Sequence, residues 1–174
     1  MIEAVLFFAG SFFLIWISIP SLRRPGSHGY YRFFAWESIW GMFLINVRNW
    51  FAHPFAWYQI ISWILLFCSL VPLFTGVYLL RNAGKPTDDL EATTLLVQSG
   101  IYHYIRHPLY ASLLYLGWGI FLKSPSLLGG CMATVVSAFL YATALADESE
   151  CMTKFGGEYA IYKKKTKMFI PFVI

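Results

Sequence analysis

Ionisable and aromatic side chains gather in the segment 100–110, where a polar stretch of the chain meets a strongly apolar one. Arg106 and His107 are adjacent hydrogen-bond donors in this segment, and three tyrosines accompany them. A second polar group, 147–150, stands at the end of the next apolar stretch and includes three carboxylates. Polar groups held at the edge of a membrane cost free energy, so residues of this kind are functional candidates.

The turn Ser124-Pro125 is so short that the apolar stretches on either side of it must form an antiparallel hairpin. This hairpin brings Arg106 and His107 close to the carboxylates of 147–150. A pocket with cationic, anionic and aromatic walls suits a zwitterionic, partly aromatic molecule, such as an adenosine-containing cofactor with an amino-acid end. The residues alone leave a second interpretation open, in which the two groups form only a salt bridge that closes the hairpin.

The composition indicates an integral membrane protein. Of the 174 residues, 58% are hydrophobic and 13% are charged, whereas a soluble chain carries about 25% charged residues. In water such a chain would expose large apolar patches, and a bilayer removes this problem. By its length we expect a single domain over 1–174, with three spans in 1–80 and a catalytic region with two spans in 81–174.

Five apolar stretches predict an all-α fold with about five transmembrane helices, because a helix needs about 20 apolar residues to span a membrane. The stretches are 2–20, 33–51, 57–80, 109–123 and 126–146. The second is the least apolar, since it contains Glu37 and Arg48. Beyond the fifth, we expect a turn at 155–157 and an interfacial helix at 158–167.

Eleven of the 13 lysines and arginines fall on one side of this five-span arrangement. The positive-inside rule therefore places the amino terminus outside and the carboxyl terminus in the cytoplasm. Both polar groups then lie on the cytoplasmic side. The same distribution explains the net charge of +4 without a nucleic-acid partner.

Other patterns carry less information. His103 and His107 are too few for a closed zinc site, and the three cysteines form no CxxC pair. We therefore expect neither a metal site nor a disulfide framework. The Gly-Trp-Gly run at 117–119 lacks the third glycine and the preceding strand of a nucleotide-binding loop, and close helix packing explains it better.

Several short blocks occur in order along the second half of the chain. They are Ser99-Gly100-Ile101-Tyr102, Arg106-His107-Pro108-Leu109-Tyr110, Asp147-Glu148, Phe155-Gly156-Gly157-Glu158-Tyr159 and Ile170-Pro171. In this order and spacing they resemble the isoprenylcysteine carboxyl methyltransferase family, whose members are related to phospholipid N-methyltransferases. The resemblance extends over residues 93 to 172, and the first half of the chain matches only as generic membrane spans.

The resemblance implies an integral membrane methyltransferase that uses S-adenosylmethionine and releases S-adenosylhomocysteine. It implies a cytoplasmic cofactor pocket formed by the loop before the fourth helix, the hairpin of helices four and five, and the carboxyl-terminal segment. Arg106, His107 and Glu148 would be catalytic, with His107 on the cofactor's carboxylate. The implied cofactor-binding residues, of which the first three would approach the adenine and the last two would hold the polar end, are Leu95, Leu96, Val97, Tyr102, His107, Pro108, Leu109, Tyr110, Asp147 and Glu148.

The methyl acceptor is a separate question. Family members that act on a carboxylate carry an arginine about four residues before the acidic pair, and Thr143 stands there in this chain. We therefore expect a lipophilic acceptor that enters from the bilayer and is neutral or amine-bearing, and a prenylcysteine carboxylate stays open if Arg48 supplies the cation. Two alternatives remain: a nicotinamide-dependent membrane reductase acting on a sterol-like lipid, and a non-catalytic membrane scaffold. No feature predicts the oligomeric state.

Overall fold

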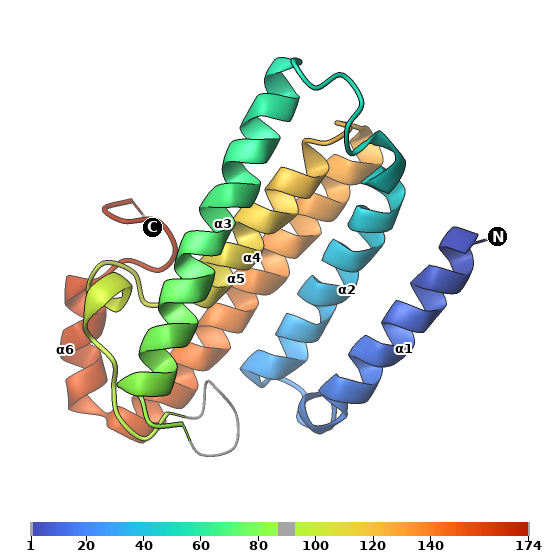
Figure 1. The fold of residues 1–174 in the computed structure, drawn as a ribbon. Helices are drawn as coiled ribbons and strands as arrows, with labels where there is room; N and C mark the ends of the chain where they lie inside the picture. Colours follow the sequence, from blue (N-terminus) through green and yellow to red (C-terminus); the bar gives the residue numbers. More distant parts are fainter. Residues whose placement is uncertain (1, 87–92, 174) are drawn as a thin grey trace. The chain divides into compact units, whose positions relative to one another are not determined.

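Helices form the regular secondary structure of residues 2–86 and 93–173, the part of the chain that the computed structural model describes (Figure 1). Two isolated β-bridges, Pro86 with Thr93 and Ile105 with Lys167, also lie within these ranges. The helices are α1 (Ile2–Leu22), α2 (His28–Asn46), η1 (Val47–Asn49), α3 (Trp57–Asn82), η2 (Gly100–His103), α4 (Pro108–Phe121), α5 (Leu127–Phe155) and α6 (Gly157–Lys165), where η marks a 3₁₀ helix. The predicted all-α fold is confirmed for the described residues.

Each of the five predicted spans corresponds to a helix. Among the described helices, α1, α3 and α5, with 21, 26 and 29 residues, are long and apolar enough to cross a membrane by length and composition. α4 has 14 residues, or about 21 Å at the usual rise, and α2 carries Arg32 and Glu37. These helices support a membrane protein, and the count of five spans stays a prediction.

The boundaries predicted for the second helix were wrong, since α2 runs from His28 to Asn46 and not over 33–51. It begins early because the Ser27 hydroxyl caps it, accepting a hydrogen bond from the Tyr30 backbone N–H at 3.3 Å. It ends at Asn46, where the chain tightens into η1, and the Asn46 side chain donates a hydrogen bond to the Met42 carbonyl at 2.9 Å.

The end predicted for the fifth helix was also wrong. α5 continues to Phe155 instead of ending near residue 146, so the polar group 147–150 lies within the helix. No glycine or proline stands between 147 and Gly156, whose φ of 55° and ψ of −126° suit glycine and stop the helix. The predicted turn at 155–157 is confirmed, and α6 follows it close to the predicted interfacial helix.

The chain divides into two compact units whose boundaries fall inside α3, α4 and α5. One unit comprises Met1–Phe67 and Leu114–Asp147, and the other comprises Cys68–Leu113 and Glu148–Ile174. Each unit therefore has its own packing. The prediction of a single domain, with a catalytic region that begins at residue 81, stays a prediction.

Small residues let the helices of the first unit pack closely. Ala133 and Val136 of α5 are fully buried, and so is Met42 of α2. A Cβ at Gly119 would stand 2.9 Å from Leu66, too close unless a neighbour shifts, and one at Gly117 would stand 3.2 Å from Val136, which is closer than usual. Close packing is therefore the role of the Gly-Trp-Gly run.

A buried lysine closes the turn between α4 and α5 in the same unit. The Lys123 side chain is 1% exposed, and its ammonium lies 3.5 Å from the centre of the Trp63 ring. It donates to the Gln59 side chain at 3.2 Å, while the Gln59 amide donates to the Lys123 carbonyl at 2.8 Å. These contacts fix the α4–α5 hairpin against α3.

Candidate active site

A buried ion pair between Arg106 and Glu148 forms the centre of the candidate site. The Arg106 Nη2 and Nε atoms lie 2.8 and 2.9 Å from Oε1 of Glu148. The side chains are only 8% and 3% exposed. The structure therefore brings together the cationic and anionic groups that the short turn at Ser124-Pro125 predicts to be neighbours. A pair this well screened from water requires close compensation of both charges.

Arg106 also holds the end of α6. Its Nη1 atom donates to the carbonyl oxygen of Thr166 and, at 3.2 Å, to that of Lys163. The last carbonyls of a helix have no partner within the helix and carry partial negative charge, so a guanidinium is well suited to them. One side chain thus joins the segment before α4 to both α5 and α6.

Backbone pairing makes this arrangement rigid. The Arg106 N–H donates to the Lys167 carbonyl at 2.8 Å, and the His107 N–H donates to the Met168 carbonyl at 3.1 Å. In return, the Lys167 N–H donates to the Tyr104 carbonyl at 3.0 Å. This short parallel bridge ties the predicted catalytic segment to the carboxyl-terminal segment. The sequence predicts that these two segments lie close together only through the family resemblance.

His107 lies on the same carboxylate as Arg106. Its Nε2 atom is 3.5 Å from Oε1 of Glu148, and the side chain is 3% exposed. The imidazole stacks on the ring of Tyr110, with centroids 5.4 Å apart and planes 16° from parallel. His103 is exposed and lies in η2, outside α4, so the two histidines do not share a helix face.

Lys163 is a site residue that sequence reasoning missed. Its ammonium lies 2.5 Å from Oε2 of Glu148, and its side chain is 47% exposed. Glu148 therefore has three basic neighbours, of which Lys163 alone lies largely in solvent. The run 163–165 contains three lysines of equal charge. The rotation of α6 about its axis determines that the first of them contacts Glu148.

The predicted pocket residues Val97, Tyr102 and Leu109 pack in one apolar cluster with Leu80. The carbonyl of Tyr102 accepts a hydrogen bond from the hydroxyl of Tyr162 at 2.7 Å. Burial raises the pKa of Tyr162, so this phenol remains a donor at neutral pH. Pro108 and Tyr110, which begin α4, are buried as well.

A cavity of about 540 Å³ contains the three residues that the resemblance places near an adenine. Leu95, Leu96 and Val97 line it, together with Phe155 at the end of α5. Its other lining residues are Ala83, Thr94, Gln98, Ser99 and Glu158. Small-molecule sites likewise combine apolar side chains with a few polar groups.

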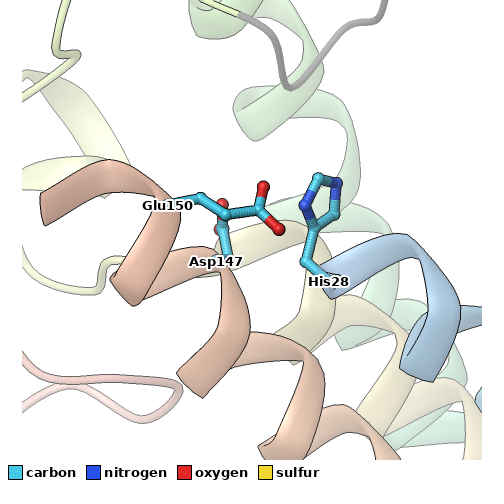
Figure 2. A group of neighbouring side chains, drawn as sticks. All are labelled: His28, Asp147 and Glu150. Atoms are coloured by element: carbon cyan, nitrogen blue, oxygen red, sulfur yellow. The ribbon is translucent and has the colours of Figure 1, made fainter. Parts of the chain in front are cut away.

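Asp147 faces a different direction from Glu148, because adjacent helix positions point about 100° apart. It stands one turn before Glu150 on α5, and His28 lies on the first turn of α2 (Figure 2). Asp147 belongs to the first unit, whereas Glu148 and its basic neighbours belong to the second. The geometry therefore favours Glu148 over Asp147 as the acidic residue of the Arg106 cluster. The roles of all these residues stay predictions.

Comparison with known proteins assigns the chain to a family. A family model described as phospholipid methyltransferase matches residues 57–158, more than half of the chain. The chain belongs to this family. The match includes α3, α4, α5 and the start of α6, and so the segments that hold Arg106 and Glu148. The predicted resemblance to membrane methyltransferases is confirmed.

A curated relative points to the same chemistry. The chain is 25% identical over 118 residues to methanethiol S-methyltransferase 1 of Bradyrhizobium diazoefficiens. The aligned region is 63% of this chain and 39% of the relative, so the chain spans about two fifths of the relative's length. No solved structure matches the chain. Both matches are methyltransferases, and neither supports the reductase alternative.

Proposed function

We propose that this chain transfers a methyl group from S-adenosylmethionine to a lipophilic acceptor. The observation that carries the proposal is the buried cluster of Arg106, His107 and Glu148. It lies in a chain of the phospholipid methyltransferase family and in the same compact unit as the cavity lined by 95–97. A purely structural ion pair would not account for the combination of these features.

The donor set suits this cofactor. Its amino-acid end carries an ammonium and a carboxylate, which call for one anion and at least one cation. Glu148 supplies the anion, and Arg106 supplies a cation that stays charged at any physiological pH. The apolar wall of Leu95, Leu96 and Val97 suits the adenine. The charged and apolar groups that such a molecule needs therefore occur in the same compact unit.

When bound, the cofactor supplies a methyl group on a positively charged sulfur, which leaves as a neutral thioether after an in-line displacement. The protein's task is to position the reactants, and effective molarity supplies about 7–11 kcal/mol in well-oriented reactions. Arg106 and His107 are suited to this task because the short bridge to 167–168 holds their backbone. The side chains of Arg106 and Glu148 are themselves only 8% and 3% exposed, and the low dielectric of a buried site strengthens the electrostatic contact between them.

The acceptor we propose is neutral or amine-bearing. Thr143 is fully buried, and its hydroxyl donates to the Phe139 carbonyl at 2.7 Å, so it offers no charge to an anionic substrate. Arg48 already forms an ion pair with Glu3 at 2.5 Å. A small thiol is a second candidate acceptor, because the chain is similar to a methanethiol S-methyltransferase.

We also propose that five helices span the membrane, with the amino terminus outside and the Arg106 cluster on the cytoplasmic side. The charge distribution supports this orientation, since most basic residues then face the cytoplasm. The cofactor enters from the cytoplasm and the acceptor from the bilayer.

Methyl transfer from radiolabelled S-adenosylmethionine, measured with purified protein in lipid nanodiscs, tests the proposed function. The acceptor panel comprises an amine-bearing phospholipid, a prenylcysteine carboxylate and methanethiol. We expect label in an acceptor of the first or third kind, and its loss in Glu148→Ala. If the protein binds the cofactor but transfers no label to any of these acceptors, the proposed transfer is wrong and the chain is a cofactor-binding protein.

A further inference from the structure

We propose that Glu158, supported by Gln98, recognises the ribose diol of the cofactor. This inference rests on the proposed function and adds a specificity-determining residue to it. Glu158 lies in the first turn of α6, and Gln98 lies in the segment before η2. Both line the cavity of about 540 Å³ that also contains the apolar wall of 95–97.

The first argument is the chemistry of the lining. Among the described residues that line the cavity, Glu158 is the one ionisable side chain, and the others are apolar or neutral polar groups. A nucleoside has a flat base that favours apolar walls and a pair of neighbouring hydroxyls that donate hydrogen bonds. A carboxylate has two oxygens that accept such bonds, and hydrogen bonds to a charged acceptor are the stronger kind.

The second argument is the way in which the carboxylate is held. The Gln98 amide nitrogen donates to Oε1 of Glu158 at 3.0 Å. Within the described ranges, 2–86 and 93–173, no hydrogen bond or ion pair engages Oε2 of Glu158. This oxygen can therefore accept a further hydrogen bond. Each carboxylate oxygen has more than one acceptor position, so Oε1 also retains capacity. Gln98 is therefore a positioning residue that holds the Glu158 carboxylate in the cavity lining.

A helix-stabilising role alone explains less. An acidic residue in the first turn of a helix interacts favourably with its amino-terminal end, and Glu158 does occupy that turn. This effect accounts for an acid near the start of α6. It does not account for the hydrogen bond to Gln98 or for a position in the cavity wall. The two explanations differ in a measurable way, since only diol recognition depends on the ligand's hydroxyls.

Calorimetric titration of the full-length protein in detergent with three ligands tests the inference. The ligands are S-adenosylhomocysteine and its 2′-deoxy and 3′-deoxy counterparts. We expect the wild type to bind at least one deoxy ligand about 10-fold more weakly than the parent compound. Glu158→Ala should bind all three with the same weakened affinity. Glu158→Gln, which keeps the shape and one oxygen, should show intermediate discrimination.

Two further variants separate recognition from structure. Glu150→Ala removes an exposed carboxylate of α5 that does not line the cavity, and it should discriminate as the wild type does. Gln98→Ala should reduce the discrimination without abolishing it, because the carboxylate remains but is less well oriented. If Gln98 and Glu158 only tie α6 to the preceding segment, their variants would weaken all three ligands equally and keep the wild-type ratios.

The outcomes distinguish this inference from the proposed function. Wild-type protein that binds S-adenosylhomocysteine but tolerates both deoxy ligands would overturn the diol assignment and leave the methyltransferase proposal standing. Discrimination that survives in Glu158→Ala would also overturn it, since the hydroxyls would then be read elsewhere. Folded wild type that binds none of the three ligands would overturn the proposed function itself.

Discussion

Arg106 serves two purposes at the scale of single residues, because it neutralises Glu148 and holds the last carbonyls of α6. Removing one partner of a buried ion pair typically costs about 3–5 kcal/mol. We expect Arg106→Leu to destabilise the protein by an amount near the lower end of this range, since Lys163 still contacts Glu148. Thermal unfolding in detergent measures the effect. Lys164→Leu, at an exposed site on α6, is the control, and an equal loss in both variants would contradict the central role of Arg106.

Thr143 leads to a prediction about the acceptor. Wild-type protein should methylate short prenylcysteine carboxylates poorly, because an unpaired anion is costly to bury. Thr143→Arg should raise that turnover if the new guanidinium reaches the substrate. Robust wild-type turnover that disappears in Arg48→Ala would show that Arg48 supplies the cation despite its ion pair with Glu3. Robust turnover in all three proteins would show that the inference from Thr143 is wrong.

The sequence predicted that Arg106 and Glu148 are neighbours, but it did not predict the contacts that surround them. Arg106 and Glu148 were expected together because a short turn joins their helices, and the structure brings them into contact. Lys163 was missed, because a run of lysines does not show which one faces Glu148 until the phase of α6 is known. The hydrogen bonds from Arg106 to α6 were missed because backbone acceptors leave no trace in the sequence.

At the scale of elements, the turn between α5 and α6 depends on one glycine. Gly156 has a φ of 55°, and a Cβ there would meet nothing within 4 Å, so backbone strain is the main obstacle to a side chain. We expect Gly156→Ala to destabilise the protein by about 1–3 kcal/mol. Gly157→Ala is the matched control, since that site is equally open but lies within α6.

The control should be neutral or stabilising, because alanine favours a helix over glycine by about 0.5–1 kcal/mol. Unfolding temperatures of the two variants in the same detergent provide the comparison. Equal behaviour of Gly156→Ala and Gly157→Ala would show that the turn tolerates a side chain. The existence of this turn was predictable from its two glycines. The extension of α5 through 147–150 was not predictable from the charges. Charged residues mark the end of an apolar span, but a helix continues until its backbone is interrupted.

At the scale of the whole molecule, the orientation in the membrane stays a prediction from the charge distribution. We expect Lys165→Cys, in protein freed of its native cysteines, to resist a membrane-impermeant thiol reagent added to intact cells. Phe55→Cys is the control, because Phe55 is 92% exposed and lies in the connection expected outside. It should react under the same conditions. Efficient labelling at position 165 with protection at position 55 would show that the orientation is the opposite of the predicted one.

The number of spans was harder to predict than the helices themselves. Apolar runs located α1 to α5, but hydropathy and length support membrane crossing for only α1, α3 and α5 among the described helices. α4 is short and α2 is partly polar, so whether they span depends on their partners, which sequence periodicity does not reveal.

The central claim, that Glu148 holds the cofactor of a methyltransferase, is tested most directly by the dissociation constant of S-adenosylhomocysteine. Calorimetry on the purified wild type, Glu148→Gln and the control Glu150→Gln provides it, with circular dichroism to show that each protein is folded. We expect saturable binding by the wild type and the control, and a loss of about 10- to 100-fold in Glu148→Gln, because a hydrogen bond to a charged group contributes about 1.5–3 kcal/mol. No saturable binding by the folded wild type, or equal affinity in all three proteins, would contradict the account.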